Sequence, residues 1–229
     1  MVSERPILFS TEMVKSILDG RKSQTRRVVK FPHDSKLGVW EPMWFNSDGA
    51  TDNHGNPVTV IPHWIMWHTR HGWTVRCPYG VPGDRLWVRE AFRSFSQRHV
   101  VNHDAKYPSH LHYAHYPDVI TIYKADGSDF PAHFYDDKQA HWQPSIHMHR
   151  YESRILLEIT EVRVQRVQSI TREDTEAEGV GCNWQPDSNQ MATFQRLWDS
   201  INAKRGYGWD ANPFVWCISF KVLPNRGEK

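Results

Sequence analysis

A long alternation of apolar and charged residues, RYESRILLEITEVRVQRVQSI (150–170), most restricts the fold of this chain. Leu157 and Ile159, and then Val162 and Val164, alternate with polar neighbours, which is the period of a strand with one buried face. The run predicts one long bent strand or a tight pair of strands. Further strands are expected at RPILFS (5–10), SQTRRVVK (23–30), HWIMWH (63–68), WTVRCP (73–78), RLWVREAF (85–92), DVITIYKA (118–125) and PFVWCISFKVL (213–223).

Three segments have the pattern of helices. STEMVKSILDG (10–20) can be capped by Ser10 or Thr11 and stopped by Gly20. TREDTEAEGV (171–180) has acidic residues in its first turn, and MATFQRLWDSINAKRG (191–206) is amphipathic. Several strands with few helices and no βαβ rhythm predict an α+β fold with a barrel-like sheet. We expect a single domain over residues 1–229, with polar, weakly periodic insertions at about 31–80 and 96–141.

Composition excludes some classes of protein. The formal net charge of +2 does not demand nucleic acid as a partner. Three cysteines without CxxC spacing argue against a disulfide framework or a thiolate zinc site, and favour a reducing compartment. No apolar stretch approaches the ~20 residues that span a bilayer, and MVSERPILFS lacks the apolar core of a signal peptide. We therefore expect a cytoplasmic protein without a membrane partner.

The stretch DGRKSQTRR (19–27) crowds four cations around two hydroxyls, Ser23 and Thr25. It is open to three interpretations: a solvated basic turn, a phosphate-binding segment, or a lysine that activates a hydroxyl. A lysine whose pKa is lowered by burial or by neighbouring cations becomes a base at neutral pH. Lys22 and Thr25 are three residues apart, so a regular strand would send them to opposite faces. A turn near Gly20–Ser23 would have to bring them together.

Other residues carry weaker signals. The acidic helix offers carboxylates that serve either catalysis or the helix dipole: Glu173, Asp174, Glu176 and Glu178. Aromatic residues interleaved with basic ones can stack a base or fill a core, and these are Trp87, Tyr207 and Trp209. His147 can line a pocket or sit in the core. HLHYAH (His110, His112, His115) could chelate zinc, but it lacks acidic partners and helical spacing, so we expect a solvated loop and no metal.

The order of these motifs resembles the ASCH family of the PUA-like superfamily, and more closely the long ASCH proteins of phages and prophages. The resemblance rests on PILFSTEMVKSILDGRKSQTRR, PGDRLWVRE, ILLEITEVRVQRVQSITREDTEAEGV and NPFVWCISFK. It implies a PUA-like β-barrel with flanking helices, and the segments 31–80 and 96–141 are extra relative to the small bacterial members. Those small enzymes are amidohydrolases of N4-acetylcytidine and related nucleosides, and for this chain we expect no cofactor.

The resemblance also implies site residues. The family signature G-x-K-x-x-T falls on Gly20, Lys22 and Thr25, and the glutamate of the acidic helix falls on Glu178, with Glu176 or Glu173 only a small shift away. Lys22 would take the proton of Thr25, which would attack the N4-acyl carbonyl of a modified cytosine nucleoside. As substrate-binding residues we predict Arg21, Arg27, Trp87, Trp209 and His147.

The same resemblance supplies alternatives to this activity. PUA-like domains bind RNA or modified DNA, and some ASCH proteins are single-strand ribonucleases. In a binder, Arg21, Lys22, Arg26 and Arg27 would contact phosphates, and aromatic residues would hold one base. A third class is a phage accessory protein that binds a host factor and keeps the pocket as a relic.

Overall fold

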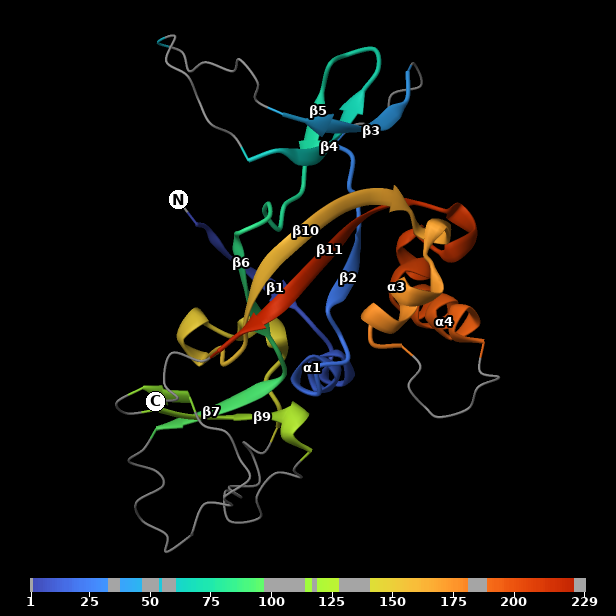
Figure 1. Cartoon of the computed structure of the whole chain (residues 1–229). Helices are drawn as coiled ribbons and strands as arrows, with labels where there is room; N and C mark the ends of the chain where they lie inside the picture. The colour runs from blue at the N-terminus through green and yellow to red at the C-terminus, as the bar shows by residue number, and fades with distance from the viewer. Residues whose placement is uncertain are drawn as a thin grey trace, which may run out of the picture. The chain divides into compact units, whose positions relative to one another are not determined.

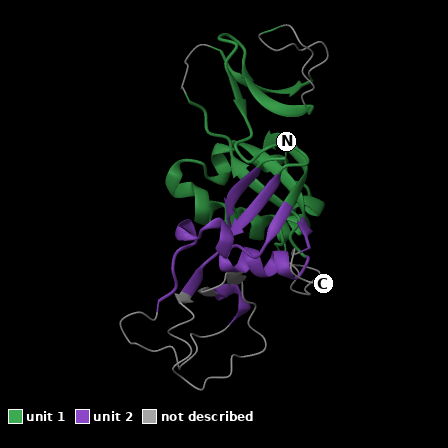
Figure 2. Cartoon of the chain, turned by 90° about the vertical axis from the view of Figure 1, so that its left-hand side faces the viewer, with its two compact units in different colours: residues 1–3, 21–84, 158–221 green, residues 4–20, 85–157, 222–229 purple. Residues whose placement is uncertain are grey.

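The computed structural model describes residues 2–32, 38–46, 54, 61–96, 114–116, 119–127, 141–180 and 189–224. These residues form two compact units, coloured separately in Figure 2. Unit 1 comprises residues 1–3, 21–84 and 158–221, and unit 2 comprises residues 4–20, 85–157 and 222–229. The prediction of a single domain with two insertions stays a prediction.

The largest sheet has five strands in the order β1-β6-β10-β11-β2. Their bounds are β1 Glu4–Leu8, β2 Gln24–Val28, β6 Arg85–Arg89, β10 Leu156–Arg166 and β11 Phe214–Leu223. β1 and β6 are parallel, and β2 and β11 are antiparallel. Across the described residues the order ends at β1 and β2, so the sheet is not closed into a barrel. The α+β class is confirmed.

β10 is one long strand, which Figure 1 shows as an arch. Leu157, Ile159 and Val162 are buried, whereas the intervening Thr160 and Glu161 are both exposed. The buried face therefore changes phase within the strand. This outcome confirms the single bent strand and rejects the pair.

In unit 1, a smaller antiparallel sheet has the order β3-β4-β5, with bounds Trp40–Phe45, His63–His68 and Thr74–Arg76. Helices α3 (Arg172–Ala177) and α4 (Gln190–Asn202) lie side by side (Figure 1). Phe194 and Trp198 of α4 share a hydrophobic core with Val215 and Cys217 of β11. Burying each aromatic side chain stabilises the fold by about 1.5–3 kcal/mol. This packing fixes α4 against β11.

Unit 2 contains helix α1 (Thr11–Leu18) and a sheet in the order β7-β9-β8. The bounds of these strands are Phe92–Ser96, Val119–Tyr123 and Ala114–Tyr116. Short 3-10 helices complete the two units: η1 Lys124–Asp126, η3 Ser145–His147, η4 Arg150–Glu152, η5 Val167–Ser169, η6 Ala203–Arg205 and η7 Trp209–Ala211. No helix in the described part of the chain is long and apolar enough to cross a membrane.

A buried cluster of charged side chains in unit 2 is centred on Arg154. Arg154 makes two hydrogen bonds to Glu90, of 3.0 and 3.1 Å, and an ion pair of 2.7 Å with Asp126. Its guanidinium lies 4.0 Å from the ring centroid of Tyr123. Burial raises the pKa of Glu90, although Arg154 acts against this rise. All these groups are buried together, so each charge depends on its partners.

Candidate active site

The backbone of unit 1 joins the start of β2 to the end of α3. Lys22 and Glu178 form an isolated antiparallel bridge, and the Ser23 N–H donates to the Ala177 carbonyl at 2.9 Å. Gly179, at φ +78°, ends the helix directly after Glu178. A left-handed residue at this position favours glycine and stops the helix. Glu178 is thereby fixed at the C-cap of α3, facing the strand.

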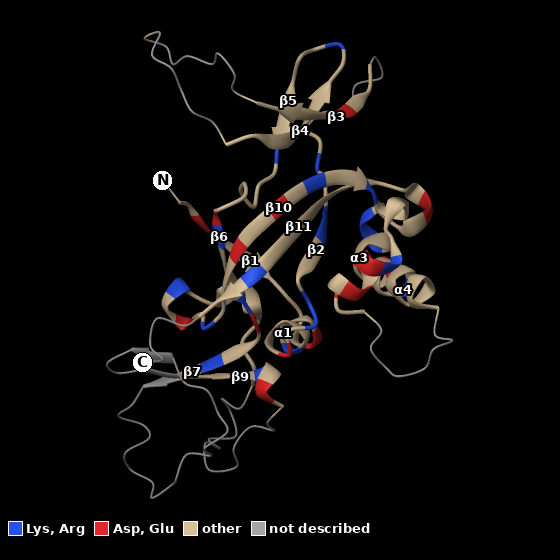
Figure 3. Ribbon diagram, viewed as in Figure 1, with Lys and Arg blue, Asp and Glu red and all other residues tan. Residues whose placement is uncertain are grey.

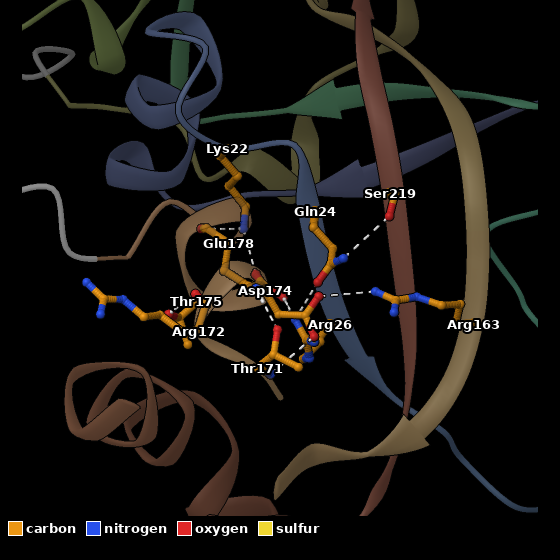
Figure 4. Close-up of polar contacts among 10 residues, drawn as sticks. All are labelled: Lys22, Gln24, Arg26, Arg163, Thr171, Arg172, Asp174, Thr175, Glu178 and Ser219. Atoms are coloured by element: carbon orange, nitrogen blue, oxygen red, sulfur yellow. Dashed lines mark hydrogen bonds and ion pairs between the residues drawn. The ribbon is translucent and has the colours of Figure 1, made fainter. Parts of the chain in front are cut away.

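The side chains of Lys22 and Glu178 form a buried ion pair (Figure 4). Lys22 Nζ donates to Glu178 Oε2 at 2.7 Å and to the Glu178 backbone carbonyl at 2.8 Å. The two residues are 2% and 7% exposed. Burial lowers the pKa of Lys22; Glu178 acts against this change, while the charges of Arg27 and Arg26 add to it. The site thus holds an amine whose charged form is disfavoured.

Arg26 connects this pair to the start of α3. Its guanidinium contacts Glu178 Oε1 at 3.1 Å and Asp174 Oδ2 at 2.7 Å, and it donates to Gln24 Oε1 at 2.5 Å. Gln24 in turn donates to Ser219 Oγ on β11 at 3.4 Å. Acidic α3 and basic β2 therefore face each other (Figure 3). We call Lys22, Arg26, Asp174 and Glu178 the buried ion-pair network.

Three groups hold Asp174 in place, and the first is the guanidinium of Arg26 described above. The Asp174 side chain accepts the Thr171 N–H at 3.3 Å in the capping box of α3, and it accepts a hydrogen bond from Arg163 of β10 at 3.1 Å. Desolvation acts to raise the pKa of Asp174, but Arg26, Thr171 and Arg163 outweigh it and hold the pKa below its usual value. The carboxylate is therefore stabilised in its charged form.

Cys217 of β11 lies opposite Arg26 in the β2–β11 ladder and is fully buried. Burial raises the pKa of its thiol to about 12, although Arg26 acts in the opposite direction. A thiol with this pKa stays protonated at neutral pH, so Cys217 is not poised as a nucleophile.

Thr25 sits in β2 opposite Ile218 and is 3% exposed. Its neighbours Gln24 and Arg26 point toward α3, as Figure 4 shows, so strand alternation directs Thr25 and Arg27 to the other face. Partial burial lowers the pKa of Arg27, and Tyr79 and Glu178 act against this change. The charge of Arg27 thus interacts with both members of the Lys22–Glu178 pair. Thr25 and Arg27 therefore share one face of β2, and Arg26 lies on the opposite face, where it contacts Glu178.

The other predicted site residues are not members of this network. Arg21 is exposed. Trp209 is half-buried and packs edge-on against Phe194, at 6.2 Å between ring centroids. Trp87 and His147 belong to unit 2, where Trp87 is buried beneath the guanidinium of Arg89 and His147 is exposed.

No group of three metal-binding side chains occurs among the residues that the structure describes. His110 and His112 of the HLHYAH motif lie outside those residues, and His115 lies in β8. The described cysteines, Cys77 and Cys217, are buried, and Cys182 falls outside the described ranges.

The sequence reasoning missed Arg26 and Asp174 as members of the network, and Gln24 and Arg163 as their supports. The sequence did contain a spacing pattern that marks Arg26 and Asp174. Lys22, Gln24 and Arg26 follow one another at a spacing of two, which is one face of a strand. Asp174 and Glu178 are four apart, which is one face of a helix. These two patterns mark a basic strand face and an acidic helix face, and only the folded chain shows that the two faces meet.

Comparison with known proteins adds little to this geometry. No family model matches the sequence, and no curated protein matches it. The crystal structure of protein EF3133 from Enterococcus faecalis V583, described with the family model DUF984, matches over 100% of this chain and 85% of that chain. Its sequence identity is 8% and its TM-score 0.40. At these values the likeness supports no conclusion about fold, family or function.

Proposed function

We propose that this chain is an amidohydrolase of the ASCH family that removes the acyl group from N4-acylated cytidine-type nucleosides. The proposal includes a PUA-like origin of the five-stranded sheet and catalytic roles for Lys22, Thr25 and Glu178. One observation carries it: a buried lysine with a lowered pKa is ion-paired to Glu178 beside the strand that carries Thr25. Amines of this kind serve as bases at neutral pH.

The proposed reaction begins with Lys22 in its neutral form. Lys22 Nζ takes the proton of Thr25 Oγ, and the oxygen forms a bond to the acyl carbonyl carbon. Arg27, which shares the Thr25 face, and backbone N–H groups stabilise the negative charge on the carbonyl oxygen. The C–N bond then breaks, and Glu178 relays the proton from Lys22 to the leaving N4 nitrogen. Water hydrolyses the acyl ester on Thr25 and releases the carboxylic acid.

Burial of the basic residues favours this activity over nucleic-acid binding. A binder would use Arg21, Lys22, Arg26 and Arg27 to contact phosphates. Lys22 and Arg26 are buried and paired with carboxylates, so they do not present their charge to a polyanion. Arg21 is exposed, but a single exposed arginine gives a weak electrostatic contact.

The test is turnover of a panel of N4-acylcytidines by the purified protein. Lys22→Ala, Thr25→Ala and Glu178→Gln should each lower kcat by at least about 100-fold, the range of a general base. Glu176→Gln is the matched control, because this residue lies on the same helix but is 51% exposed on its side chain and should retain wild-type activity. Wild-type turnover by Lys22→Ala and Thr25→Ala would refute the mechanism. Short single-stranded RNAs, assayed for cleavage and for salt-dependent binding, test the alternative.

A further inference from the structure

The two oxygens of the Glu178 carboxylate have different partners. Oε2 accepts from Lys22 at 2.7 Å, and Oε1 contacts Arg26 at 3.1 Å. The proposed chemistry needs only the first contact. The second comes from a side chain that is 1% exposed and is itself held by Asp174 and Gln24. A buried arginine fixed on three sides gives the carboxylate a single orientation.

We propose that Arg26 is a positioning residue: it holds Oε1 of Glu178, so that only Oε2 is presented to Lys22. This inference rests on the proposed function and adds a residue outside the Lys22–Thr25–Glu178 set. Arg26 does not touch the reacting atoms. Arg26 acts through Glu178. Asp174 in turn holds Arg26 through an ion pair of 2.7 Å.

Electrostatics gives Arg26 a second effect in the same direction. The charged groups that act on Lys22 are Glu178 from the end of α3, and Arg27 and Arg26 from β2. Glu178 favours the ammonium form of Lys22, whereas both arginines favour the neutral amine. Arg26 adds its own positive charge, and it also neutralises part of the charge on Glu178. Without Arg26, the Glu178 carboxylate would interact with Lys22 alone. The pKa of the Lys22 amine would then be higher.

The kinetic test compares pH profiles of kcat/KM for the wild type and Arg26→Gln. The acid limb of the variant should move to higher pH by about one unit, with a loss of about tenfold at neutral pH that is regained at alkaline pH. Arg26→Lys restores the charge but not the double contact, and should lie between the two. Arg172→Gln is the control: it removes an exposed guanidinium that pairs with Glu176 on the surface of α3, and should leave the profile unchanged. A uniform loss at all pH values would show a merely structural role and overturn the proposal.

A second measurement does not depend on turnover. In protein labelled at lysine side chains, NMR can follow the protonation of Lys22, with its resonance assigned by comparison with Lys22→Ala. The resonance should titrate at higher pH in Arg26→Gln than in the wild type, and Asp174→Asn, which loosens Arg26 indirectly, should shift it in the same direction. Equal titration in all three proteins would overturn the role of Arg26. Absence of turnover in the wild type would instead overturn the proposed function, while the NMR result still decides the role of Arg26.

Discussion

Replacing Glu178 by glutamine should destabilise the protein strongly, because the substitution removes a charge and keeps the shape. Glu178 contacts Lys22 at 2.7 Å and Arg26 at 3.1 Å, and all three side chains are buried. At an effective dielectric constant of ~20, each attraction is worth about 5–6 kcal/mol before the cost of desolvation, and for Lys22 this applies to its protonated form. Removing one partner of a buried pair has a measured cost of about 3–5 kcal/mol. We expect a loss in that range for Glu178→Gln.

Chemical denaturation at pH 7 measures this loss directly, and thermal unfolding should show a Tm lowered by about 6–20 °C for a chain of this size. Glu176→Gln is again the matched control. Glu176 pairs with Arg172 at 3.6 Å on the surface of α3, and an exposed pair of this type contributes about 0.3–0.5 kcal/mol.

A double variant separates charge from packing. Adding Lys22→Met to Glu178→Gln removes one of the two stranded cations and should recover part of the loss. The two substitutions should therefore couple by about 0.5–3 kcal/mol. If Glu178→Gln unfolded within about 1 kcal/mol of the wild type, or if the two substitutions were additive, the buried pair would not have the strength inferred from its geometry.

Three further outcomes follow from the charged and buried groups. The lowered pKa of Lys22 means that the unfolded chain binds this proton more tightly, so wild-type stability should rise with pH below about 10, and urea unfolding of Lys22→Met should lack this rise. Cys217, with a pKa of about 12, should resist thiol labelling in the folded protein and react after unfolding, as peptide mapping can show. Arg154→Met strands the carboxylates of Glu90 and Asp126 and should cost about 3–5 kcal/mol in urea unfolding, less at acidic pH, where Glu90 takes up a proton.

Local signals predicted most of the elements. The cap residues Ser10 and Thr171 start α1 and α3 as expected, and the strand at residues 63–68 has the predicted bounds. β3 was missed because residues 31–80 are only weakly periodic, and its Pro42 is an exception within a strand. The structure explains the exception, since β3 is an edge strand of its sheet and an edge tolerates a residue without an N–H donor.

The site was only partly predictable, because its contacts are not local. Lys22 and Glu178 are 156 residues apart, and no pattern within either segment pairs them. Glu178 was singled out through the family resemblance, and Arg26 was treated only as one of four clustered cations. Its burial depends on carboxylates supplied by α3, which only the folded chain brings to β2. Trp209 was chosen because an indole ring can stack on a base. In the fold this ring packs against Phe194.

Stability alone does not explain why this fold buries four charged side chains between β2 and α3. Apolar residues of similar volume often replace a buried ion pair without loss, because desolvation offsets most of the Coulomb attraction. The groups within the network are also unequal: Asp174 is stabilised as a charged group, whereas Lys22 is held against its own charged form. A purely structural cluster has no need of a destabilised ammonium. A proton acceptor does need one, since an amine with its ordinary pKa stays protonated at neutral pH. Under the proposed mechanism this imbalance is what a functional site requires, because Asp174 is favoured as a carboxylate while burial disfavours the ammonium form of Lys22.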